Sequence, residues 1–237
     1  MRLNMRIDHK KITLILALVF IVLELACFPM IHFGSGGVDV LGCYLAIVLV
    51  ALFTLVTIKG DRVGHIIRLG IAFTLVADYF LVIAADSQLE GVIAFIAVQA
   101  CYFAYTLVRE KRVKVRYTNI ASRALLMAGL VIVTFAVLGE GADALAIASV
   151  LYYGNLVANA VFAFLLGKRE RIFAIGLVLF AMCDIWIGLE VLFSSYLGSN
   201  LMDFVYNANC NLPWVFYQPS QVLIGLRLGE LEMRNIK

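Results

Sequence analysis

The sequence predicts an all-α integral membrane protein, a polytopic bundle of eight transmembrane helices. Hydrophobic residues make up 63% of the 237-residue chain and charged residues only 15%, and the mean hydropathy is +0.98. Soluble domains contain roughly 45–50% apolar and 25% charged residues. The apolar residues form continuous runs rather than alternating ones, which favours helices over a β-barrel as the structure that satisfies the backbone in lipid.

Eight apolar runs are long enough to cross roughly 30 Å of hydrocarbon. They occupy residues 12–30, 40–58, 66–84, 90–108, 120–138, 143–166, 171–193 and 204–226. The links between them are short, so we expect residues 1–237 to form a single membrane domain. The first run lacks a small-residue cleavage site, which favours a spanning helix over a cleavable signal peptide.

The basic residues predict the orientation of the bundle. Every Lys and Arg except Arg123 lies before the first run, at or beside the links that follow the second, fourth and sixth runs, or near the C-terminal end. The links on the other side contain acidic residues but no Lys or Arg. Because basic links are retained in the cytoplasm, we expect both termini to be cytoplasmic, in a multi-pass protein of a bacterial cytoplasmic membrane.

Two aspartates lie deep inside apolar runs. Asp78 in "GIAFTLVADYFLVI" and Asp184 in "GLVLFAMCDIWIGL" each follow a glycine, Gly70 or Gly176, at the same spacing. Each aspartate is about 12 residues, or roughly 18 Å, from the predicted cytoplasmic end of its helix. A charge at this depth costs several kcal/mol and is a functional-site hypothesis by default. The two runs also suggest two parallel four-helix repeats, with chance similarity as the alternative.

Two further carboxylates interrupt apolar runs. Glu24, in the first run, lies at a depth similar to that of the aspartates, and we interpret it as structural, either an isolated protonated acid or a partner of Arg123 or Arg68. Glu190 follows Asp184 by about 240° around the helix, so the two face different directions. We interpret Glu190 as a structural residue or as one at the mouth of a cavity.

Amide and phenol side chains converge on the level of the aspartates and are candidate substrate-binding groups. They are Gln99, Tyr102, Tyr152, Asn155, Asn159, Tyr217 and Gln221. For any one of them, a hydrogen bond between neighbouring helices is the structural alternative. The sequence contains no cluster with metal-ligand spacing, no nucleotide-binding glycine loop and no nucleic-acid-binding surface, so we expect no metal, cofactor or nucleic-acid partner.

Three stretches resemble a known family. "VADYFLVI…GVIAFIAVQACYFAY" resembles the "GD-x-x-L…F-x-x-G-x-x-x-F-x-x-x-H-x-x-Y" stretch of the YhhN-like, or lysoplasmalogenase, family. "GLVLFAMCDIWIGL" resembles the helix of that family that carries an "SD" pair, and "WVFYQPSQVLIGL" resembles its closing Tyr-x-x-x-Gln-x-x-Ile helix. The chain departs from the family pattern at Ala77 (usually Gly), Cys183 (usually Ser) and Gln99 (often His).

The resemblance implies a lipid hydrolase. Its assigned reaction is cleavage of the vinyl ether bond of a lysoplasmalogen, which yields a fatty aldehyde and a glycerophospho-base. Vinyl ether cleavage begins with proton delivery to carbon and passes through an oxocarbenium-like cation, so it requires one protonated carboxyl and one ionised carboxylate, as in glycosidases. Asp78 and Asp184 are the expected catalytic pair, with a lysophospholipid as the expected substrate.

Two other functions fit the same residues. Buried carboxylates among amide side chains, in a possible parallel repeat, also suit a proton- or sodium-coupled transporter of a small solute. A non-catalytic lipid-binding homologue is the third possibility, because Gln99 stands where a histidine is common in the family.

Overall fold

The computed structural model describes residues 2–57, 62–84, 87–192 and 211–235. Within these ranges the chain is helical and contains no strand. The long helices are α1 (Arg2–Phe33), α2 (Val38–Thr57), α3 (Arg62–Asp78), α4 (Gln88–Arg109), α5 (Val113–Leu138), α6 (Ala144–Leu165), α7 (Arg171–Leu192) and α9 (Leu212–Asn235). Three short turns accompany them: the π-helical turn η1 (Tyr79–Ile83) and the 3-10 turns η2 (Gly139–Gly141) and η3 (Lys168–Glu170).

The predicted all-α membrane bundle is confirmed. Seven stretches, corresponding to α1 through α7, are long and apolar enough to cross a membrane, so the chain is an integral, multi-pass membrane protein. Several helices extend past the predicted apolar runs: α1 begins in the polar residues before the first run, and α5 begins at Val113. Hydropathy marks the hydrocarbon-spanning part of a helix and not the turns that project beyond it.

The eighth helix, α9, differs from the prediction. The predicted run 204–226 begins outside the described residues, and the observed helix continues to Asn235. Gln218, Gln221 and Arg227 interrupt its apolar character, and α9 is not among the seven stretches. The helix packs against α1, α2, α3 and α7, which shield it from lipid and allow it to carry buried polar side chains.

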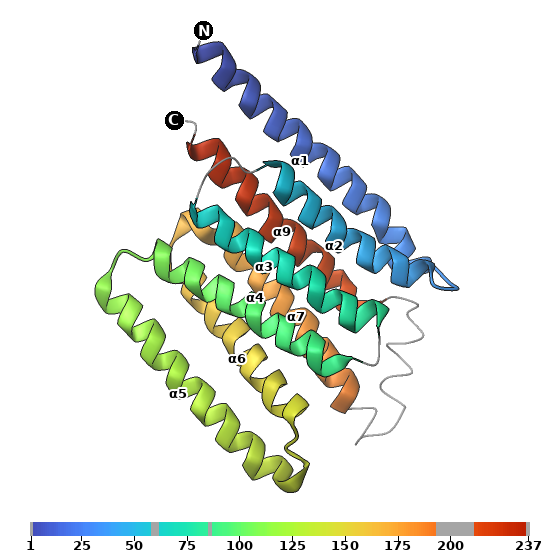
Figure 1. Cartoon of the computed structure of the whole chain (residues 1–237), viewed down its shortest axis with the longest axis vertical. Helices are drawn as coiled ribbons and strands as arrows, with labels where there is room; N and C mark the ends of the chain where they lie inside the picture. Colours follow the sequence, from blue (N-terminus) through green and yellow to red (C-terminus); the bar gives the residue numbers. More distant parts are fainter. Residues whose placement is uncertain (1, 58–61, 85–86, 193–210, 236–237) are drawn as a thin grey trace.

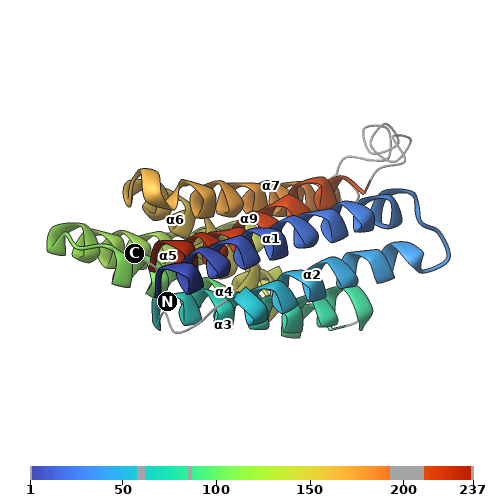
Figure 2. The ribbon, with the colours of Figure 1, turned by 90° about the horizontal axis from the view of Figure 1, so that it is seen from above.

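The helices lie side by side in one bundle, with α1 and α5 at opposite edges (Figure 1). The two termini lie at the same end of the bundle (Figures 1 and 2). We call this the terminal end; the orientation prediction places it in the cytoplasm. The largest cluster of buried side chains joins residues of α1 through α4, α6, α7 and α9, whereas α5 packs mainly on α6.

Helix contacts in the two halves of the chain correspond to one another. The α1–α2, α2–α3 and α3–α4 contacts have counterparts in α5–α6, α6–α7 and α7–α9, and the α4–α6 contact between the halves has its counterpart in α9–α2. Gly70 lies against Tyr102 of α4, and Gly176 lies against Ile224 and the Ser220 carbonyl of α9. The glycine that precedes each aspartate therefore occupies the same helix interface in its half, as a parallel repeat predicts.

The close approach at Gly176 leads to a first prediction. A Cβ at this position would lie 2.9 Å from Ile224 Cγ1 and 3.0 Å from the Ser220 carbonyl oxygen, which cannot easily move. We expect Gly176→Ala to destabilise the protein by ~1–3 kcal/mol, the usual cost of overpacking. Thermal unfolding in detergent measures the effect. Gly188→Ala is the matched control in the same helix, because nothing lies within 4 Å of its Cβ position; equal melting temperatures for the two variants would contradict the close packing.

Candidate functional site

Asp78 is the last residue of α3 and is 3% exposed. Its Oδ2 accepts a hydrogen bond of 2.6 Å from the hydroxyl of Tyr217 in α9. Directly after Asp78 the helix widens into the π-helical turn Tyr79–Ile83. Gly91 of α4 lies against this turn, where a Cβ would be 2.5 Å from Leu81 Cγ. π-helical turns are rare and frequently occur at functional sites, so the backbone itself marks the position of Asp78.

Asp184 has an equivalent partner from a different helix. Its Oδ2 accepts a hydrogen bond of 2.6 Å from the hydroxyl of Tyr152 in α6. Both aspartates are therefore bonded at Oδ2 by a tyrosine, and among the described residues no hydrogen bond is made to Oδ1 of either carboxyl. Short O–H···O bonds to a carboxyl are among the stronger hydrogen bonds in proteins, and they fix both side chains at bilayer depth.

Aromatic rings connect the two tyrosine–aspartate pairs. The ring of Phe180 lies 5.2 Å from that of Tyr217 and 6.3 Å from that of Tyr152, measured between centroids. Phe95 packs on both Tyr152 and Phe180, at 5.3 and 5.4 Å. The structure thus brings the two aspartates into one site, with the tyrosines on an apolar wall.

Three of the predicted binding residues gather elsewhere, around Arg123. Its guanidinium donates to the side-chain oxygens of Asn155 (2.7 Å) and Asn159 (2.9 Å), and the ring of Phe103 lies 4.2 Å from its central carbon. Asn159 Nδ2 in turn donates to Gln99 Oε1 at 2.9 Å. Asn155 and Asn159 therefore solvate a buried cation and Gln99 bonds Asn159, which is the structural alternative for these side chains.

The remaining predicted residues occupy separate places. Tyr102 packs edge-on against Phe173 at 5.3 Å and lies within electrostatic range of Asp78. Gln221 is 1% exposed, and its Nε2 donates to Ser220 Oγ at 3.4 Å. The side chain of Glu190 lies outside the described residues.

Glu24 has a different partner from those expected. Neither Arg123 nor Arg68 bonds it among the described residues; instead, Gln218 Nε2 lies 3.1 Å from Glu24 Oε2. Arg123 is occupied by amide oxygens, and Arg68 Nη2 donates to the Thr54 carbonyl at 3.1 Å. Among the described residues, the Glu24 carboxyl is therefore bonded by the side-chain amide of Gln218 in α9 and not by either of the two expected arginines.

Comparison with known proteins identifies the family. The YhhN family model matches residues 38–226, which is most of the chain. The chain belongs to the YhhN family. No curated protein and no solved structure shows a significant match. In this YhhN protein the matched region includes α2 through α7 and most of α9, and thus both tyrosine–aspartate pairs, whereas α1 precedes it.

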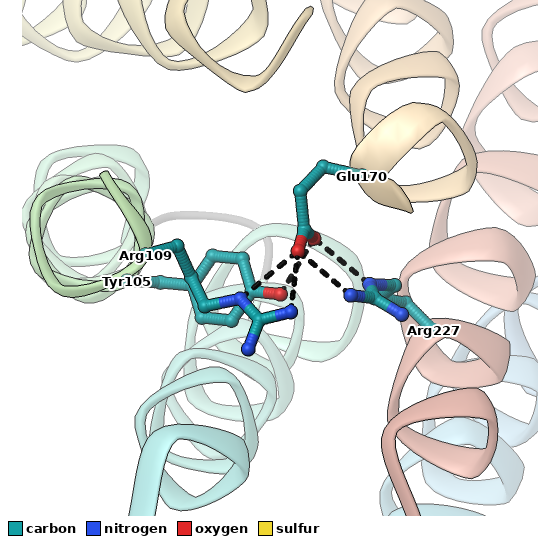
Figure 3. A network of polar contacts seen from close by, with 4 residues as sticks. All are labelled: Tyr105, Arg109, Glu170 and Arg227. Atoms are coloured by element: carbon teal, nitrogen blue, oxygen red, sulfur yellow. Dashed lines mark hydrogen bonds and ion pairs between the residues drawn. The ribbon is translucent and has the colours of Figure 1, made fainter. Parts of the chain in front are cut away.

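A second polar network joins three helices at the terminal end of this YhhN protein. Figure 3 shows Glu170 between Tyr105 and Arg109 of α4 on one side and Arg227 of α9 on the other. The carboxylate accepts bonds of 2.7 Å from Tyr105, 2.8 and 2.9 Å from Arg109, and 2.7 and 2.8 Å from Arg227. Arg227 is fully buried. Because Glu170 lies directly before α7, one carboxylate fixes the ends of α4, α7 and α9.

An adjacent ion pair is more exposed. Glu110 accepts two bonds from the guanidinium of Arg112, whose side chain is 59% exposed. Hydrogen bonding to Arg112 holds the pKa of Glu110 below its usual range. Arg112 also donates to the Leu165 carbonyl at 2.8 Å, which connects the α4–α5 link to the end of α6.

One feature of the sequence, which a hydropathy profile does not register, could have predicted the Glu170 network. Glu170 is the single acid in the basic link "KRER", and an acid placed among cations is a candidate ion-pair partner.

Among the described residues, no group of three or more His, Cys, Asp or Glu side chains is arranged to hold a metal ion.

The Glu170 network leads to a second prediction. Glu170→Gln removes the negative charge between two arginines and turns one acceptor into a donor that faces donors. We expect a loss of about 3–5 kcal/mol, as for other buried pairs that lose one partner. Glu110→Gln is the control for loss of a carboxylate whose arginine partner is largely exposed, and we expect it to be the smaller of the two losses. Unfolding in detergent measures both variants, and a Glu170→Gln protein as stable as Glu110→Gln would show that the network does not hold the helices together.

Proposed function

We propose that this YhhN protein is a membrane-embedded hydrolase that cleaves the vinyl ether bond of a lysoplasmalogen, releasing a fatty aldehyde and a glycerophospho-base. One observation carries the proposal: two aspartates at bilayer depth, each bonded by a tyrosine and both within one apolar site. The family membership supports the same reaction class.

The chemistry needs two carboxyls in opposite states. One carboxyl delivers a proton to the carbon of the vinyl ether that lies distal to oxygen, and the resulting oxocarbenium-like cation is stabilised by the other, ionised carboxylate. Water then adds to the cation, its proton passes to the ionised carboxylate, and the hemiacetal collapses to aldehyde and alcohol. Glycosidases use paired carboxyls for an analogous cation. Asp78 and Asp184 supply the pair here.

The tyrosines have a positioning role in this scheme. Tyr217 and Tyr152 each hold one carboxyl oxygen, so the free oxygens keep a fixed orientation toward the substrate. Correct orientation of a catalytic group contributes several kcal/mol to a reaction barrier. Phe180 and Phe95 provide an apolar surface beside the carboxyls, as the single long chain of a lysolipid requires.

Aldehyde release tests the proposal directly. We expect purified protein to release fatty aldehyde from a lysoplasmenyl lipid, and Asp78→Asn and Asp184→Asn each to lose about 100-fold or more of this activity, because each removes one member of an acid–base pair. Glu140→Gln, an exposed acid in the α5–α6 link, is the control for loss of a carboxylate.

The other outcomes point to the two alternative functions. A folded wild-type protein that releases no aldehyde refutes the hydrolase. Solute uptake driven by a proton or sodium gradient in proteoliposomes would then indicate a transporter. Saturable binding of a lysolipid without turnover or uptake would indicate a lipid-binding homologue.

A further inference from the structure

A buried carboxyl outside the family match contacts the residue next to Tyr217. Glu24 lies in α1, is 3% exposed and is surrounded by the apolar residues of its helix. Gln218 Nε2 donates to the Glu24 carbonyl oxygen at 2.6 Å and to its Oε2 at 3.1 Å. An apolar side chain would pack α1 on α9 without the cost of a carboxyl at bilayer depth, so packing alone does not account for Glu24.

Gln218 bonds α1 at the turn of α9 where a proline interrupts the helical hydrogen bonds. Gln218 lies between Tyr217, which binds Asp78, and Pro219 inside the helix. Pro219 has no N–H, so the Val215 carbonyl one turn earlier loses its helical hydrogen bond. Two side-chain contacts support this turn instead: Ser220 Oγ donates to the Tyr217 carbonyl at 2.6 Å, and Gln218 is bonded to α1.

We propose that Glu24 is a positioning residue: through Gln218 it fixes the turn of α9 that holds the Tyr217 hydroxyl on Asp78. The inference rests on the proposed function, because it assigns Glu24 a role in the orientation of a proposed catalytic carboxyl. It also gives α1 a role in the site, although the family match begins only at residue 38. Glu24 acts as a hydrogen-bond acceptor in this role and does not exchange a proton with the substrate.

The test uses the full-length protein in lipid nanodiscs and two independent measurements. The first is the ¹⁹F NMR resonance of 3-fluorotyrosine at position 217, which reports the surroundings of that ring whether or not the protein is active. The second is the kcat and KM of aldehyde release by the unlabelled protein. The variants are Glu24→Gln, which keeps a side-chain oxygen acceptor, and Glu24→Leu, which removes that acceptor and leaves Gln218 only the main-chain carbonyl of residue 24.

We expect Glu24→Gln to match the wild type in the Tyr217 resonance, in kcat and in the pH profile, because an amide oxygen accepts the same hydrogen bond. Glu24→Leu shifts or broadens the resonance and lowers kcat about tenfold or more, with little change in KM, because a misplaced catalytic group affects the chemical step. Glu90→Leu, at an exposed glutamate in the first turn of α4, is the control for the same substitution and leaves both measurements unchanged.

The double variant Glu24→Leu/Gln218→Leu keeps the test valid if Glu24→Leu alone does not fold. Gln218→Leu is measured beside it. Removing both partners leaves no buried amide unsatisfied, and we expect the Tyr217 resonance and the kcat of the double variant to differ from the wild type as those of Gln218→Leu do, because both changes act through one contact. An unchanged Tyr217 resonance in folded Glu24→Leu or in the double variant overturns the proposal, as does a double variant whose kcat is far below that of Gln218→Leu. If the wild type releases no aldehyde, the proposed hydrolase fails, and the resonance alone still decides whether Glu24 positions Tyr217.

Discussion

The exclusion of water from the bilayer is the constraint on which this structure depends. Every polar group at that depth must find a partner within the protein, and the described side chains largely do so in defined groups. Asp78 and Asp184 have tyrosines, Arg123 has asparagine oxygens, and Glu170 has two arginines. These contacts join helices that are distant in sequence, so they determine which helices are neighbours as much as the apolar packing does.

The two kinds of polar group occupy different levels of the bundle. The ion pairs among the described residues lie at the terminal end, where they close the ends of α4, α7 and α9 around Glu170. The carboxyls at mid-depth are bonded by neutral hydroxyls and amides instead. A carboxylate saturated by arginines is unsuited to proton transfer, whereas one held by a single hydroxyl retains a free oxygen. The arrangement therefore separates structural charge from the proposed chemistry.

Sequence patterns predicted the helices and the two aspartates, because hydropathy and depth depend on local composition. They did not predict which partner each polar side chain finds. Gln99, Asn155 and Asn159 lie at the level expected for substrate binding, yet the oxygens of Asn155 and Asn159 bond Arg123 of α5, and Gln99 bonds Asn159. The π-helical turn after Asp78, which packs against Gly91 of α4, has no sequence signature.

The correspondence of the two halves is incomplete in a way that bears on mechanism. The helices that carry Asp78 and Asp184 are equivalent in their contacts, but their tyrosines are not. Tyr217 reaches Asp78 from the other half of the chain, whereas Tyr152 and Asp184 belong to the same half. Two close carboxyls in identical surroundings can share a proton in either order, whereas unequal surroundings decide which of the two is protonated. In the proposed hydrolase, two similar halves with unequal tyrosine partners give each carboxyl a different environment at one depth.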